Sequence, residues 1–350
     1  DKYAQLEAEP PYALPRSRAF YDIGWVALHS DLISVNNDVN LFLKSSPQGS
    51  ISHSHGEQNS FTLTAWGEPL VISGGYYDWY GSPHHYEYTR HSRSKNTILV
   101  NGEGQHPRSL EANGKIVDFF TGSGYDLTVG EAGTAYGGKL DQFDRKVLYC
   151  VPDYFIMVDY LKAPSPANYN WLLHTLSPMK IDEKENRVAL EQHGVNLEVY
   201  FLWPGKLQFQ QTDKFYTKGD ALTVYKEKEE PPETEMPQQY HLAATTKAEA
   251  KGNFVTVLYP YKEQAELKFT GSLNSNVYQI LATGKGRRDV TLVSMNQVST
   301  DLSGSGMEAQ GKLAAATWQD NKVNKLFLEA GTSLKLDGKQ YLTASSPATL

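Results

Sequence analysis

The chain has 350 residues, of which 40% are hydrophobic and 21% are charged, a composition typical of globular proteins and long enough for one large or two medium β domains. Its formal net charge of -7 provides no basic field to attract nucleic acid or an anionic membrane, so an acidic polymer would have to bind at a local site. The sequence contains no run of 18 apolar residues, so we expect no membrane-spanning helix.

The first residues predict a connector rather than a folded element. Residues 1–18 contain Pro10, Pro11 and Pro15, which lack a backbone N–H and interrupt any helix begun upstream. Because the chain opens on Asp1 and not on Met, we interpret it as the C-terminal portion of a longer protein.

Short β-prone runs then follow one another. Residues 39–44 place Val39, Leu41 and Leu43 on one face, and residues 60–66 alternate apolar and threonine side chains, as half-buried strands do. Further strands are expected at 23–28, 143–151, 154–160, 188–190, 195–202, 207–211, 254–259, 277–281, 290–294, 313–318, 325–329 and 334–336.

This strand series predicts an all-β fold, an antiparallel β-sandwich of stacked sheets with almost no helix. Residues 19–230 are expected to form the main sandwich. Residues 226–237 are rich in charge and proline and are interpreted as a solvated loop or boundary. Residues 231–350 then supply the remaining sandwich strands or a small C-terminal β subdomain.

Four residues in the middle of the chain are interpreted as structural. Arg145 and Asp159 lie on adjoining expected strands and are interpreted as solvated rim charges, with an ion pair as the alternative. Cys150, the only cysteine, cannot form an intrachain disulfide and fits a small buried hydrophobe. His174 ends an expected strand and is interpreted as a packed structural histidine.

Residues 51–61 concentrate two histidines, an acid and two amides directly before a strand. A histidine titrates near neutrality, so His53 or His55 beside amide donors could act as a base, an acid or a charge partner for a bound carboxylate. At i and i+2 on a strand the two rings would point the same way. Surface or core histidines without a chemical role are the alternative.

Four segments in a fixed order carry a family resemblance. They are His-x-His-x-x-x-Asn-Ser-Phe at 53–61, Gly-Glu-Pro-Leu at 67–70, Gly-Tyr-Tyr at 75–77, and Lys-Asn-Thr at 95–97 followed by three apolar residues and Asn-Gly. Over residues 20–107 this set resembles the β-sheet domain of the heparinase II/III-like polysaccharide lyases, which follows an (α/α) toroid. The resemblance implies a supersandwich arrangement of the sheets, an N-terminal toroid as partner domain, and a secreted or periplasmic location.

The resemblance also implies residue roles. His53 would be catalytic, as a base or as a charge partner for the substrate carboxylate, with Gln58 and Asn59 contacting substrate or orienting the ring. His55 would be structural.

A tyrosine is expected to complete the site, because relatives place one between the Gly corner and the Lys-Asn-Thr block. The candidates are Tyr76, Tyr77, Tyr80, Tyr86 and Tyr88. Of these, Tyr86 and Tyr88 are predicted to be catalytic and Tyr77 to bind substrate.

Five further residues are candidates for substrate binding. Arg90, Arg93 and Lys95 could bind uronate carboxylates or sulfates, because guanidinium and ammonium groups donate to such anions; solvated loop charges are the alternative. His84 and His85 are predicted to line the sugar cleft, with a turn after Pro83 as the alternative.

No metal or other cofactor is expected. Relatives of this kind bind a structural zinc through the second histidine of the block, an aspartate before the Gly corner and a histidine before the Asn-Thr pair. The last two positions are Ser73 and Lys95 here, which leaves only His55 where about four ligands are needed. The Ser-Lys-Asn version is similar to the exo-acting alginate and heparin lyase branches.

The resemblance implies cleavage of a 4-linked uronate polysaccharide by β-elimination, with alginate as the first choice of substrate and heparin or heparan sulfate as the second. A non-catalytic carbohydrate-binding or structural β module is the main alternative. A metal-dependent hydrolase built on His53, His55 and Asp78 is a weaker one, because Asp78 has no partner histidine at a fixed spacing.

Overall fold

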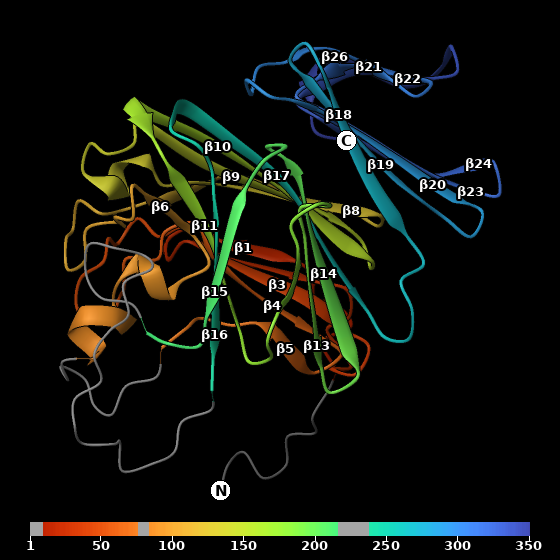
Figure 1. The fold of residues 1–350 in the computed structure, drawn as a ribbon. Helices are drawn as coiled ribbons and strands as arrows, with labels where there is room; N and C mark the ends of the chain where they lie inside the picture. The colour runs from red at the N-terminus through yellow and green to blue at the C-terminus, as the bar shows by residue number, and fades with distance from the viewer. Residues whose placement is uncertain (1–9, 76–83, 216–237) are drawn as a thin grey trace, which may run out of the picture.

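An eight-stranded antiparallel sheet runs through the middle of the molecule and carries other sheets on both of its faces (Figure 1). The last sheet, formed by strands within residues 300–348, packs on the neighbouring C-terminal sheet and not on the central one. The computed structural model describes residues 10–75, 84–215 and 238–350. Within these ranges the regular structure is almost entirely β, with only short helical turns, so the predicted all-β antiparallel sandwich is confirmed.

The central sheet has the strand order β12-β13-β14-β17-β10-β9-β8-β7. Its strands are β7 (Lys115–Thr121), β8 (Tyr125–Glu131), β9 (Gln142–Cys150), β10 (Tyr154–Ala167), β12 (Lys180–Asp182), β13 (Arg187–Gln192), β14 (Val195–Trp203) and β17 (Glu249–Tyr261).

Two smaller sheets cover one face of the central sheet. The five-stranded sheet contains β1 (Arg18–Phe20), β2 (Trp25–His29), β3 (Val39–Lys44), β4 (Ser60–Ala65) and β5 (Glu68–Val71) in chain order. The four-stranded sheet has the order β15-β16-β11-β6, with β6 (Ile98–Val100), β11 (Tyr169–Thr175), β15 (Gln208–Thr212) and β16 (Tyr240–Thr245). The short helical turns are η1 (His85–Thr89), η2 (Ser92–Ser94) and η3 (Gly133–Tyr136).

Two C-terminal sheets complete the fold and are drawn in blue in Figure 1. One contains β18 (Lys268–Asn274), β19 (Val277–Gly284), β20 (Arg287–Ser294), β23 (Leu313–Gln319) and β24 (Lys322–Glu329). The other contains β21 (Thr300–Gly304), β22 (Met307–Gly311), β25 (Gly331–Leu336) and β26 (Lys339–Ala348). The predicted division at residue 230 lies outside the described residues. The strands β16 and β17 that follow it pair with β11, β15, β10 and β14.

Alternating side chains on β10 explain why the central sheet carries partners on both faces. Phe155 and Met157 join the core shared with the five-stranded and four-stranded sheets, whereas Ile156 and Val158 join the core shared with β19, β20 and β23. Successive strand residues point to opposite faces, so an apolar run such as this one buries both. Cys150 is buried in the second core, as predicted.

Arg145 and Asp159 form a fully buried ion pair, so their interpretation as solvated rim charges is wrong. They are cross-strand partners on β9 and β10 and face the first core. The guanidinium donates to both carboxylate oxygens, at 2.6 and 2.9 Å, and also to the backbone carbonyls of Asn59 and Asn96 at 2.7 and 2.8 Å. Trp171 Nε1 donates to the same carboxylate. The pair therefore fixes two chain segments that lead into the candidate site.

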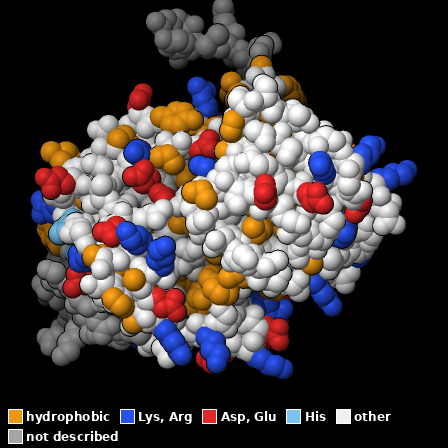
Figure 2. Space-filling view, turned by 90° about the horizontal axis from the view of Figure 1, so that it is seen from above, with side chains coloured by type: hydrophobic (Ala, Val, Ile, Leu, Met, Phe, Trp, Pro, Cys, Tyr) orange, Lys and Arg blue, Asp and Glu red, His pale blue; other side chains and the backbone are white. Residues whose placement is uncertain are grey.

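The surface carries charges of both signs. Figure 2 shows Lys and Arg side chains interspersed with Asp and Glu over one face of the molecule, in keeping with the net charge of -7. Among residues 10–75, 84–215 and 238–350, no helix has the length and hydropathy needed to cross a membrane.

Candidate active site

The outward face of the five-stranded sheet carries the polar and aromatic side chains of the candidate site. On β2, β3 and β4 the residues facing the core are apolar, and the alternate residues face outward. Strand register places Trp25 opposite Lys44, and Lys44 opposite Ser60. Two residues further along the same face, Phe42 lies opposite Thr62. The face therefore combines two aromatic rings, an ammonium group and hydroxyl groups.

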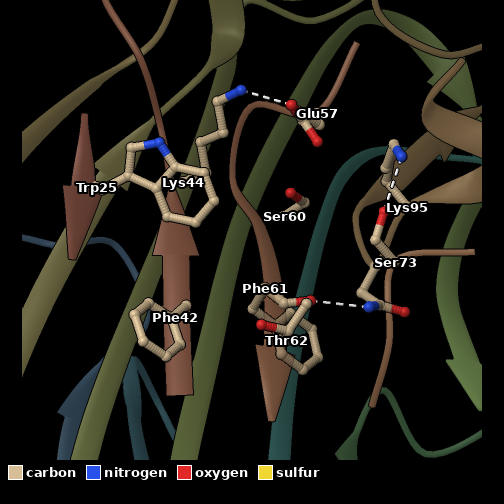
Figure 3. Close-up of a pocket in the computed structure, with 10 residues that line it drawn as sticks. Trp25, Phe42, Lys44, Glu57, Ser60, Phe61, Thr62, Ser73 and Lys95 are labelled. Atoms are coloured by element: carbon tan, nitrogen blue, oxygen red, sulfur yellow. Dashed lines mark hydrogen bonds and ion pairs between the residues drawn. The ribbon is translucent and has the colours of Figure 1, made fainter. Parts of the chain in front are cut away.

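A hollow of about 60 Å³ opens over this face. Its lining residues are Trp25, Phe42, Lys44, Glu57, Ser60, Phe61, Thr62, Ser73, Lys95 and Asn96. Figure 3 shows the rings of Trp25 and Phe42 on one side and Ser73 with Lys95 on the other. Several water molecules or a small anionic group would fit a volume of this size.

Two ammonium groups and one carboxylate dominate the electrostatics of the hollow. Lys44 Nζ lies 2.5 Å from Glu57 Oε1, and Lys95 Nζ donates to Ser73 Oγ at 2.7 Å. Burial lowers the pKa of Lys95 to about 8, against the opposing effect of Glu57. Burial alone would raise the pKa of Glu57, but Lys95 and Lys44 lower it to about 2. When both lysines are protonated, the hollow has one positive charge in excess.

His53 and His55 face different surroundings, although only one residue separates them. Both lie in the turn before β4 and not on the strand itself, so the expectation that their rings point the same way does not hold. His53 is exposed, whereas His55 is half-buried with its ring centroid 5.9 Å from that of His85. Burial, reinforced by Lys95, lowers the pKa of His55 to about 3. A neutral, packed His55 suits a structural role, and the exposed His53 can reach a ligand.

Arg90 holds the His53 turn in place through hydrogen bonds to its backbone. Its Nη2 donates to the backbone carbonyl of Ser52 at 2.7 Å and to that of Ser54 at 3.3 Å, on either side of His53. The residue is 1% exposed. Direct binding of a substrate carboxylate, predicted for Arg90, is therefore corrected to a positioning role.

The family models match residues 13–267 as "Heparinase II/III-like, C-terminal". The chain belongs to the heparinase II/III-like family. The matched span includes the His53 turn, every residue that lines the hollow and the whole central sheet. No curated protein sequence matches the chain.

Solved structures share the fold of this heparinase II/III-like chain. The heparan sulfate lyase HepC from Pedobacter heparinus aligns with a TM-score of 0.65 and 18% identity over 84% of this chain and 45% of its own. A heparinase III gene product with methylated lysines aligns with a TM-score of 0.62 and 14% identity, over 91% of this chain and 44% of its own. A further heparinase III aligns with a TM-score of 0.61 and 15% identity, over 80% of this chain and 43% of its own. The chain thus spans less than half the length of these proteins.

Gln58 and Asn59 support the loops of this heparinase II/III-like domain, and their predicted contact with substrate is wrong. Both side chains are 0% exposed. The Gln58 amide accepts from the backbone N–H of Ser46 at 2.6 Å and donates to backbone carbonyls at residues 49 and 112. Asn59 donates to the carbonyls of residues 130 and 143. These side-chain amides form hydrogen bonds with backbone groups that have no strand partner in this irregular segment. Buried polar groups generally need such partners.

Of the three predicted cations, only Lys95 lines the hollow. Arg93 is buried in the turn η2, and its backbone carbonyl faces His174 Nε2 at 2.9 Å. His174 Nδ1 lies 3.0 Å from Asn96 Oδ1, and the residue is 0% exposed, so the predicted packed structural histidine is confirmed.

A buried aromatic cluster adjoins η1. The Tyr88 hydroxyl lies 3.4 Å from His241 Nδ1, and the rings of His84 and Phe215 pack on Tyr88. Burial lowers the pKa of His241 to about 3, although Asp213 opposes the shift. Because Tyr88 is 0% exposed, its predicted catalytic role is corrected to packing.

The other aromatic candidates have different placements. Tyr86 is 38% exposed, with the Arg108 guanidinium 5.1 Å from its ring centroid, and stays a candidate. His85 is only 1% exposed, so it does not meet its predicted role of lining the sugar cleft. His84 is half-buried, and its ring packs on Phe215 and Tyr88. Tyr76, Tyr77, Tyr80 and Asp78 lie outside the described residues.

Three residues of the hollow were missed in the sequence. Trp25, Phe42 and Lys44 line it, yet none of them belongs to a recognised motif. The available signal was the alternation of residues 39–44, which places Phe42 and Lys44 opposite the apolar face. Within the described ranges, no group of three or more His, Cys, Asp or Glu side chains is arranged to hold a metal ion. The absence of zinc stays a prediction.

Proposed function

We propose that this chain is the C-terminal β part of a polysaccharide lyase that cleaves a 4-linked uronate polysaccharide by β-elimination, with heparan sulfate or heparin as the first substrate to test. The observation that carries the proposal is the exposed His53, held by Arg90, in the same turn as Glu57, which lines the cationic hollow. The family match over residues 13–267 supports it. The structural neighbours carry heparan sulfate lyase names, which favours that substrate over alginate, the first choice from the sequence.

The reaction assigns a job to each group. A base removes the proton at C5 of the uronate, the C–H electron pair forms the C4–C5 double bond, and the C4–O4 bond breaks with its electrons on O4, which an acid protonates. His53 acts as the base or as the charge partner of the carboxylate. Lys95 neutralises the carboxylate, which makes the C5 proton acidic. Tyr86 is the tyrosine candidate for the remaining proton transfer.

An N-terminal toroid domain would supply the rest of the cleft, since this chain spans only about 45% of HepC. We also propose a location outside the cytoplasm, where acidic polysaccharides are met. The family resemblance supports both proposals.

The test is formation of unsaturated product, followed by ultraviolet absorbance, with heparan sulfate, heparin and alginate as substrates for the full-length protein. Product from heparan sulfate that is lost in His53→Ala supports the proposal. Oligosaccharide binding without product from any of the three would leave the non-catalytic carbohydrate-binding module as the function.

A further inference from the structure

We propose that Trp25, Phe42 and Lys44 form a subsite on the sheet, beside the His53 turn, that binds one acidic sugar unit of the glycan. The inference rests on the proposed function for its substrate class. Its residues come from β2 and β3, and His53 is not among the residues that line the hollow. These three residues would therefore hold the chain without supplying a group to the reaction, whereas Lys95, on the opposite side of the hollow, is the group assigned to the substrate carboxylate.

The placement of the two aromatic rings first indicates a sugar. Trp25 faces outward and is 39% exposed. A small polar residue would also be compatible with this outward strand position, so folding alone does not require a large aromatic ring there. Phe42 is half-buried on the next strand, with the His29 ring packed edge-on against it at a centroid distance of 5.4 Å, and it still lines the hollow. Aromatic rings with accessible faces beside hydroxyl groups bind the apolar faces of sugars and orient their polar edges.

The polar groups around the rings then indicate a negative charge on that sugar. Lys44 Nζ lies 5.7 Å from the Trp25 ring centroid and is also paired with Glu57. Lys95 Nζ adds a second ammonium on the far side of the hollow (Figure 3). Two ammonium groups against one carboxylate leave a positive excess, in a chain whose net charge is -7.

Hydroxyl groups complete the set of contacts. Ser60 and Thr62 line the hollow between the aromatic side and Lys95, and Ser73 lies on the Lys95 side (Figure 3). Each hydroxyl can donate and accept a hydrogen bond. A uronate or a sulfated sugar stacked on Trp25 would place its anionic group toward the ammonium groups, where charge-assisted hydrogen bonds are strong. A neutral sugar would gain the stacking but not the charge interaction.

The test compares Trp25→Ala with Trp66→Ala by calorimetric titration of the full-length protein. The probes are an oligosaccharide of heparan sulfate, its unsulfated counterpart and a neutral chitin oligosaccharide. Trp66 is the matched control, because Lys262 Nζ lies 5.2 Å from its ring centroid but the residue lies outside the hollow. Trp25→Phe tests whether a smaller ring suffices, and thermal melting confirms that each variant is folded.

We expect Trp25→Ala to weaken binding of both acidic probes by on the order of tenfold, a loss of about 1.4 kcal/mol, while Trp66→Ala binds them like the wild type. Added salt should weaken the acidic probes and not the neutral one. Unchanged affinity in folded Trp25→Ala, or equal affinity for neutral and acidic probes, would overturn the subsite. Trp25-dependent binding without any unsaturated product would instead reject the lyase function and keep the subsite.

Discussion

Lys95 donates a hydrogen bond from Nζ to Ser73 Oγ across 2.7 Å, although only 3% of the lysine is exposed. Ser73 follows β5 and Lys95 follows η2, so the bond joins two segments that border the hollow. Burial disfavours the charged ammonium and lowers its pKa to about 8, while Glu57 opposes the shift. A lysine that titrates this close to neutrality makes stability depend on pH in the alkaline range.

The first prediction concerns that dependence. An unfolded lysine has a pKa of 10.5, against about 8 for folded Lys95, so between these values the unfolded state binds more protons than the folded state. The free energy of unfolding should therefore rise with pH across this window, by on the order of 1–3 kcal/mol from Lys95. Urea denaturation from pH 7.5 to 10.5 should show a smaller rise in Lys95→Met.

Lys115→Met is the matched control, because the Lys115 side chain is 61% exposed. Its pH profile should follow that of the wild type. If Lys95→Met and the wild type show the same slope, Lys95 does not titrate in this window and its ammonium is better accommodated than burial alone indicates.

The second prediction concerns Arg145 and Asp159. Removing one member of a fully buried ion pair leaves an uncompensated charge, which typically destabilises a fold by about 3–5 kcal/mol. We expect Arg145→Met and Asp159→Asn each to show a loss of this size in urea denaturation. The double variant Arg145→Met with Asp159→Leu should recover part of it, since both charges are then removed.

An exposed pair provides the comparison. Lys162 and Asp141 lie 3.5 Å apart, with side chains 51% and 45% exposed, and such pairs contribute about 0–1 kcal/mol. Lys162→Met should change stability by no more than this. A similarly small loss in Arg145→Met would show that the buried pair tolerates the loss of its cation.

This pair also marks the limit of sequence reasoning. Period-two alternation was sufficient to predict β3 and β4, because a buried face repeats every second residue, and continuous β-prone runs predicted β9 and β10. It could not show that Arg145 and Asp159 face the core. Charged residues at such positions look like surface charges until strand register brings them together, and the other partners of Arg145 are carbonyls more than 40 residues distant.

The candidate site was predictable to a different extent. The motif identified the His53 turn, but polar residues within it look alike whether they face a ligand or the backbone, so Gln58 and Asn59 were misassigned. Arg90 was misassigned for the same reason. Trp25 and Lys44 were missed because they meet only when β2 pairs with β3.

The third prediction concerns acid. His241 has a pKa of about 3 in the fold against 6.5 when unfolded, so between these values the unfolded state binds more protons. Its contribution to stability is complete above pH 6.5 and is lost as the pH falls toward 3. In His241→Gln the slope of unfolding free energy between pH 6.5 and 4 should be shallower by up to about 1.4 kcal/mol per pH unit.

His193→Gln serves as the control, because the His193 side chain is 74% exposed. Denaturation at half-unit pH steps should give it the wild-type slope. Acid sensitivity that is identical in His241→Gln and the wild type would assign the loss to other groups, of which His55 and Glu57 are the first to test, since their pKa values are also lowered.

The last prediction separates the two histidines of the turn. His53 is exposed, so His53→Ala in the full-length protein should leave the melting temperature almost unchanged. If its ring acts on the substrate, turnover of heparan sulfate should fall by on the order of 10²–10⁴. His55 is half-buried and neutral beside His85 and Lys95. His55→Ala should therefore cost about 1–3 kcal/mol of stability.

Turnover and melting measured on both variants decide between the roles. In His55→Ala, activity should fall only in proportion to the folded fraction, because Arg90 still holds the His53 turn through the carbonyls of Ser52 and Ser54. Alginate is the second substrate, so that a change in preference is not mistaken for a loss of chemistry. Near-wild-type turnover in folded His53→Ala, on whichever polymer the protein cleaves, would remove His53 from the reaction and leave the base to be sought among groups such as Tyr86.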